Sequence, residues 1–215
     1  MSKPSDEYWR ERRDEFLAQL EKDESALRKR LEKVYASEAA KLDRLIAAYY
    51  AQYGEDKVIE YRRLLQSISA EDRTLLMERM DEFARKYPQY ADLMPVRESI
   101  YRLNELEAIQ MQIRIQQYEI GAIEQAELER HFSEQARRYD SEVVKATVGA
   151  AWAAGDDFSA RIWANRKKLA SYLNDDFSKL IARGVSYDEI SRELRARLNH
   201  SGTRTAMRLV YTAGT

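Results

Sequence analysis

A single apolar stripe along residues 6–53 constrains the fold more than any other feature of the sequence. It consists of apolar residues that recur at spacings dominated by three, four and seven: Trp9, Phe16, Leu20, Leu27, Leu31, Val34, Leu42, Leu45 and Tyr49. These spacings predict one long helix with a single apolar side. Because a lone helix with so narrow a stripe cannot form a core, we expect it to pack against another helix, of the same chain or of a partner.

Composition extends this expectation to the whole chain of 215 residues. Glycine occurs 7 times and proline 3 times, while the helix-favouring residues alanine, leucine, glutamate and arginine are abundant. Sheet-rich folds need frequent turn residues, which are scarce here. Hydrophobic residues make up 44% of the chain, enough for a substantial core. The predicted fold class is therefore all-α.

Capping and turn residues predict the element boundaries of the first half. Gly54 should end the first helix, because glycine adopts the left-handed conformation of a C-terminal cap. A short helix is expected over residues 55–66. Ser69 predicts the start of a helix over residues 70–86, since its hydroxyl can accept a hydrogen bond from a free backbone N–H, and a proline at position 88 ends it.

A second long helix is expected from about Val96 to residue 120, and a further helix over residues 124–147. Gly121 between them predicts a close helix contact, because a glycine inside a helix costs about 1 kcal/mol relative to alanine. Four glutamines line this region: Gln110, Gln112, Gln116 and Gln117. Their amides could hydrogen-bond between helices, but most of them are expected to face water.

A small-residue linker over residues 149–157 predicts two regions, a long-helix bundle of residues 1–148 and a small C-terminal helical module of residues 149–215. In the module, one helix is expected up to Arg183 and a second from Ser186, which with Glu189 forms a capping box. The second helix is expected to end near Asn199, and a final helix to start at Ser201. The predicted architecture is an elongated helix bundle with this module attached.

The sequence contains none of the patterns typical of enzymes. It has no cysteine, which excludes disulfides and thiolate metal sites, and no glycine-rich phosphate loop. Its two histidines, His131 and His200, lie far apart, whereas a zinc site needs three or four ligands at short spacings. No apolar run is long enough to span a membrane. We therefore predict a protein that is not an enzyme and that has no cofactor, metal or membrane-spanning segment.

Charge permits a DNA contact without requiring one. The net charge is −1, but residues 141–215 contain 12 basic and 8 acidic residues. Residues 187–194 and 203–210 superficially resemble a helix-turn-helix. No glycine follows Leu194 where the turn should lie, and Arg204 and Arg208 are the only basic side chains on the second segment. Sequence-specific DNA recognition is therefore disfavoured.

The C-terminal third has an order and spacing of residues seen in a known family. It comprises Phe158-Ser159-Ala160-Arg161-Ile162-Trp163-Ala164-Asn165, then Leu169, Leu173 and Gly184-Val185-Ser186, then Arg208-Leu209-Val210-Tyr211-Thr212. The upstream stretch over residues 99–113 and the opening Tyr8-Trp9 fit the same pattern. The chain thus resembles the phage head morphogenesis (minor head, or minor capsid) proteins, which include the Mu F-like proteins. Ala213 departs from the glutamate usual there.

The resemblance implies a minor structural component of the virion, made in the host cytoplasm and held inside the head. Such proteins associate with the portal and other capsid components in procapsid assembly, and in some phages accompany DNA during ejection. The motif residues are Phe158, Ser159, Arg161, Ile162, Trp163, Asn165, Arg208, Leu209 and Thr212.

Helical spacing indicates core roles for Ile162 and Trp163. The candidate phosphate contacts are Arg161, Arg204 and Arg208, for which salt bridges or a solvated surface are the default.

Two alternatives remain open at this point. One is a protein that contacts packaged double-stranded DNA through phosphates alone, with salt-sensitive binding by residues 141–215. The other is a free coiled-coil adaptor with no role in the virion. A homo-oligomer is compatible with each of them.

Overall fold

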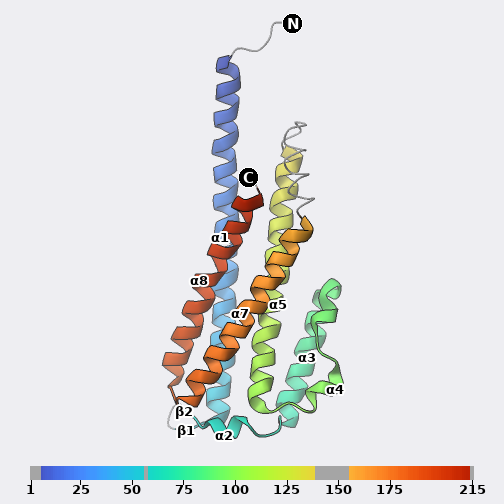
Figure 1. The fold of residues 1–215 in the computed structure, drawn as a ribbon, viewed down its shortest axis with the longest axis vertical. Helices are drawn as coiled ribbons and strands as arrows, with labels where there is room; N and C mark the ends of the chain where they lie inside the picture. The colour runs from blue at the N-terminus through green and yellow to red at the C-terminus, as the bar shows by residue number, and fades with distance from the viewer. Residues whose placement is uncertain (1–5, 56–57, 139–154, 214–215) are drawn as a thin grey trace.

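The computed structural model describes residues 6–55, 58–138 and 155–213, and these form an elongated helical bundle (Figure 1). The all-α prediction is confirmed. Five long helices make up the bundle: α1 (Asp6–Tyr53), α3 (Ala70–Lys86), α5 (Glu105–Arg138), α7 (Gly155–Ala182) and α8 (Tyr187–Ala213). Short elements connect them: β1 (Gly54–Glu55), β2 (Val58–Ile59), α2 (Tyr61–Leu64), the 3-10 helix η1 (Pro88–Leu93) and α4 (Arg97–Ile100).

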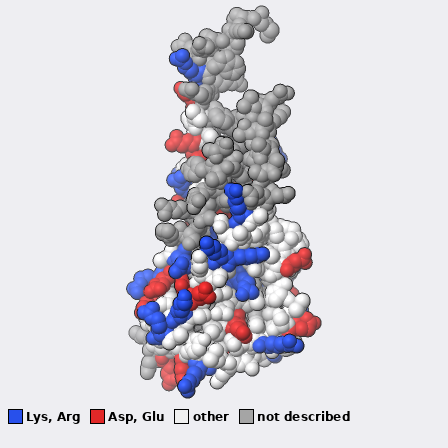
Figure 2. Space-filling model, in the orientation of Figure 1, with Lys and Arg blue, Asp and Glu red and all other residues white. Residues whose placement is uncertain are grey.

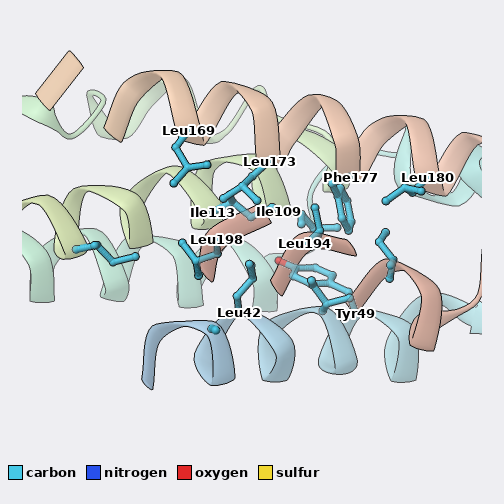
Figure 3. Close-up of a cluster of buried hydrophobic side chains, with 14 of the residues drawn as sticks. Leu42, Tyr49, Ile109, Ile113, Leu169, Leu173, Phe177, Leu180, Leu194 and Leu198 are labelled. Carbon is cyan, nitrogen blue, oxygen red and sulfur yellow. The ribbon is translucent and has the colours of Figure 1, made fainter. Parts of the chain in front are cut away.

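One hydrophobic core joins α1, α5, α7 and α8. Figure 3 shows side chains from all four helices pointing toward one another, among them Leu42, Ile113, Phe177 and Leu194. The two C-terminal helices have 28 and 27 residues and contribute to this core along with the N-terminal ones. They therefore pack into the same core as α1 and α5. The predicted boundary at residues 148 and 149 lies outside the described residues.

A second core holds α3 against the other side of α5. Phe83 of α3 is fully buried there and packs near Tyr118 of α5, with the ring centroids 6.5 Å apart. Ser69 starts α3 as predicted, because its hydroxyl accepts a hydrogen bond from the Asp72 N–H at 3.0 Å. In the part of the chain that is described, no helix is long and apolar enough to cross a membrane.

The prediction of a helix over residues 55–66 is wrong. β1 and β2 form an antiparallel hairpin, in which Gly54 pairs with Ile59 and Glu55 with Val58, and the short helix α2 follows. The Ile59 side chain is only 1% exposed, so the hairpin buries a β-branched residue that favours extended backbone.

The second long helix begins at Glu105 and not near Val96. Asn104 caps it: the Asn104 side-chain oxygen accepts from the Glu107 N–H, and the Glu107 carboxylate accepts from the Asn104 N–H, both at 2.9 Å. From there α5 runs through Gly121 without interruption to Arg138. The rest of the helix predicted over residues 124–147 lies outside the described residues.

The predicted break between residues 199 and 203 is also wrong, because α8 is a single helix from Tyr187 to Ala213. Leu198 and Met207 are both buried, on either side of Gly202, so packing holds the helix together across this weak point. The continuous helix leaves no turn for a helix-turn-helix motif.

Candidate functional site

Helix α7 carries the first group of motif residues, and the structure separates them into inner and outer positions. Ile162 is fully buried, whereas Arg161 and Asn165 are exposed. The side chains of Phe158, Arg204, Arg208, Leu209 and Thr212 lie outside the described residues. Figure 2 shows basic and acidic side chains interspersed over one face of the bundle, with no extended region of one sign.

Trp163 and Ser159 meet at one residue of α5. The Trp163 indole N–H and the Ser159 hydroxyl both donate to the side-chain oxygen of Gln125, each at 3.1 Å. The indole ring also packs on Tyr90 of η1, with a centroid distance of 4.5 Å. A methyl group on Gly121 would lie 3.1 Å from the indole ring, so the glycine allows α5 and α7 to approach closely. The predicted close contact at Gly121 is confirmed, and Trp163 is partly buried against the second core.

A buried ion pair lies one helical turn further along α7. Arg166 donates through Nε and Nη2 to the Glu124 carboxylate, at 2.8 and 2.6 Å, and through Nη2 to the Tyr35 hydroxyl at 2.6 Å. These three side chains join α7, α5 and α1, and each is 2% exposed. Burial raises the pKa of the Tyr35 hydroxyl, which the neighbouring Glu124 carboxylate reinforces. The group therefore consists of a guanidinium, a carboxylate and a neutral phenol.

A surface groove of about 900 Å³ lies between α1 and α3, with α5 as its floor. The wall on α1 carries Lys41, Arg44 and Leu45, and the wall on α3 carries Leu75, which is 55% exposed. Apolar surface with charged edges on parallel helix walls is suited to bind another helix. We refer to this depression as the α1–α3 groove.

The floor of the α1–α3 groove is polar and hydrogen-bonded across helices. Gln112 accepts from the Arg79 guanidinium at 2.9 Å and donates to the Tyr49 hydroxyl at 3.2 Å. Gln116 donates to the backbone oxygen of Glu38 at 2.7 Å, but its own side-chain oxygen is buried without a partner. The expectation that the glutamines mostly face water is therefore wrong: Gln112, Gln116 and Gln117 are at most 7% exposed.

A second polar cluster connects the end of α1 to the starts of α3 and α5. The Asp72 carboxylate accepts from the Tyr53 hydroxyl at 2.7 Å and from the Gln52 amide at 2.9 Å. Next to it, Glu105 accepts from the Ser69 backbone N–H at 2.6 Å, and its second oxygen is buried without a partner. Burial raises the pKa of the Glu105 carboxyl, and the nearby Asp72 carboxylate raises it further.

This raised pKa predicts a pH-dependent stability. The folded chain retains the Glu105 proton at pH values where the unfolded chain has lost it, so this contribution to the free energy of unfolding falls as pH rises from about 4.5 through the raised pKa. In Glu105→Gln, we expect a smaller fall over this range and higher stability at pH 7. Urea unfolding between pH 4 and pH 8 measures this. The control Glu71→Gln, which removes a surface carboxylate, should keep the wild-type slope; equal slopes for all three proteins would contradict the prediction.

Among the residues that the structure describes, no cluster of three or more histidine, aspartate or glutamate side chains could hold a metal ion. His131 is 2% exposed. Its ring contacts the Phe132 ring, with the centroids 5.6 Å apart, and its Nε2 lies 3.0 Å from the Gln135 amide nitrogen. The Arg166 and Glu124 pair was not predicted. The sequence does carry a signal for this pair, because each charge falls on an otherwise apolar side of its helix. Arg166, for example, lies at helical spacing between Ile162 and Leu169.

Comparison with models of known protein families, with curated proteins and with solved structures finds no match to this chain.

Proposed function

We propose that this chain is a non-enzymatic structural protein of a phage head, which associates with the portal during procapsid assembly by binding a helix of its partner in the α1–α3 groove. The resemblance of residues 152–212 to the minor head proteins supports the phage assignment. The groove is the single observation that supports a helix-binding role. Two helices form its walls, and its lining combines apolar side chains such as Leu45 and Leu75 with charged ones.

One detail of the groove favours an occupant. Leu75 exposes 55% of its surface there, although its neighbour Leu76 is fully buried in the second core. A partner helix that covers Leu75 would remove this apolar surface from water.

The partner supplies the matching chemistry. Lys41 and Arg44 on the α1 wall favour acidic residues along one side of the bound helix. The α3 wall carries both signs, with Glu78 and Glu82 alternating with Arg79 and Arg85, and so favours a mixed polar edge on the other side. Between these charges, the bound helix should present apolar residues to Leu75 and Leu45. Specificity in this arrangement comes from the charges, and affinity comes mostly from the apolar contact.

Co-expression with the portal protein of the same phage, followed by affinity capture, tests the proposal. We expect Leu75→Glu to lower the binding affinity roughly 10–100-fold, since burial of one leucine contributes about 1.5–3 kcal/mol. The matched control is Leu65→Glu, because Leu65 is 50% exposed and lies outside the groove. Equal capture of both variants and the wild type would rule out the groove as the binding site, and no capture of the wild type would refute the portal partnership.

A further inference from the structure

A polar cleft of about 370 Å³ lies between α5 and α7, which run side by side in Figure 1. The two helices are antiparallel, since the Gln110 amide near the start of α5 donates to the Ser178 hydroxyl near the end of α7 at 2.8 Å. Both helices contribute polar side chains to the lining: Gln110, Arg114 and Tyr118 from α5, and Lys167, Ser171, Asn174 and Asp175 from α7. We call this depression the α5–α7 cleft.

Two side chains in the lining are buried and yet lack a hydrogen-bond partner. Tyr118 is 8% exposed and Asn174 is 7% exposed. Among the described residues, neither the Tyr118 hydroxyl nor the Asn174 side-chain amide has a partner, although the Tyr118 ring packs near Phe83 and Trp163. Buried hydroxyls and amides normally have partners, and both groups can donate a hydrogen bond. The cleft therefore offers two donors that the fold itself does not use.

Two cations lie on opposite walls of the α5–α7 cleft. Arg114 of α5 and Lys167 of α7 are both exposed, and neither has an ion-pair partner in the part of the chain that is described. Ser171 adds a hydroxyl one helical turn after Lys167. Asp175, the carboxylate of this lining, follows by a further turn and so lies toward the Gln110 end of the cleft. The two cations outnumber this carboxylate.

We propose that the α5–α7 cleft binds a phosphate group. A guanidinium, an ammonium, two hydroxyls and an amide line one depression, and donors of these kinds bind the oxygens of phosphate in proteins. The volume is that of a small-ligand pocket, so it accommodates a phosphate together with part of the molecule that carries it. Arg114, Lys167 and Ser171 are exposed, so a ligand reaches the cleft from the surface.

The same chemistry would bind a phosphate of a nucleic-acid backbone or a phosphate of a small molecule. The cleft does not include the side chains of Arg161, Arg204 and Arg208, the candidate phosphate contacts from the sequence. It also shares no residue with the α1–α3 groove. Phosphate binding therefore stands or fails independently of the proposed association with the portal.

Titration of the full chain with inorganic phosphate at constant ionic strength, measured by calorimetry, tests the site. We expect Arg114→Met/Lys167→Met to weaken phosphate binding roughly 100-fold, because each charge-assisted hydrogen bond contributes about tenfold. Lys168→Met is the matched control, since the Lys168 ammonium lies over the Tyr172 ring, outside the cleft. It should bind phosphate as the wild type does. Equal affinity of the double variant and the wild type, or no binding by the wild type, would overturn the proposal.

Tyr118→Phe tests the buried donor, because it removes the hydroxyl and keeps the ring. We expect the affinity for inorganic phosphate to fall about threefold to tenfold. The urea unfolding midpoint should stay unchanged, since the hydroxyl has no partner among the residues that the structure describes. Tyr172→Phe, at an exposed tyrosine outside the cleft, should change neither quantity. A loss of stability in Tyr118→Phe with unchanged phosphate affinity would show that the hydroxyl serves the fold instead.

A labelled DNA duplex and a nucleoside monophosphate distinguish the two sources of phosphate. If Arg114→Met/Lys167→Met weakens salt-sensitive binding of the duplex, measured by fluorescence anisotropy, the ligand is a nucleic-acid backbone. If the double variant loses only the nucleoside monophosphate, the ligand is a small phosphorylated molecule. Unchanged binding of both probes by the double variant would contradict a phosphate site in the α5–α7 cleft.

Discussion

Replacement of Arg166 by methionine is expected to lower the free energy of unfolding by about 3–5 kcal/mol. The substitution leaves the Glu124 carboxylate buried at 2% exposure without its cation, and it removes the donor to the Tyr35 hydroxyl. Both losses occur where α1, α5 and α7 meet. Chemical unfolding, followed by circular dichroism, measures the change.

The double variant Arg166→Met/Glu124→Leu is the matched control. It removes both charges together, so we expect it to regain most of the stability that the single variant loses. The unpaired Tyr35 hydroxyl should account for a remaining deficit of about 1 kcal/mol. If the single variant loses less than about 1 kcal/mol, or if the double variant is the less stable of the two, the ion pair does not have the assigned role.

The second large effect is expected at Gly121. A Cβ atom there would already lie 3.1 Å from the Trp163 ring and 3.2 Å from Cγ of Arg166. In Gly121→Leu, the larger side chain would force α5 and α7 apart and would disturb the packing of Trp163 on Tyr90. We expect a loss of about 3 kcal/mol, after a gain in helix propensity of about 1 kcal/mol is taken into account.

Ala126→Leu is the control for this substitution, because Ala126 lies on the same helix and is exposed. It should change stability by less than about 0.5 kcal/mol. The Trp163 environment adds a second measurement, since Gly121→Leu should shift tryptophan fluorescence and Ala126→Leu should not. Equal stability of the two variants would show that α5 and α7 tolerate a wider separation than the contact at Gly121 suggests.

Local signals in the sequence predicted some elements well. The bounds of α1 and α3 agree with the structure because each has a long periodic stripe, and the predicted cap at Ser69 starts α3. Gly54 does follow the last residue of α1, but the left-handed cap predicted there is wrong: among the described residues the glycine with a positive φ is Gly184, and Gly54 is the first residue of β1. In contrast, the apolar residues at 100 and 103 extended the stripe of α5 upstream. The capping box at Asn104 was overlooked, and it sets the start of that helix.

Tertiary packing decided the features that the sequence did not reveal. The Ser201-Gly202 pair is a plausible helix end, but the buried side chains around it keep α8 continuous. Amide side chains normally favour water, yet Gln112 and Gln116 are buried because partners on α1 and α3 accept and donate hydrogen bonds there. The α1–α3 groove depends on how three distant helices are arranged, which no local pattern reports.

Helix α1 also connects the two ends of the bundle through a single rigid element. It is one uninterrupted helix of 48 residues, about 72 Å long, and it supplies both the N-terminal end that extends past the other helices in Figure 1 and one wall of the α1–α3 groove. A stiff rod of this kind transmits a tilt from one end to the other with little bending. A torque on the N-terminal end of α1 would therefore change the width of the α1–α3 groove at the other end of the helix. A partner helix bound tightly in the groove would in turn restrict the angles that the N-terminal end can adopt.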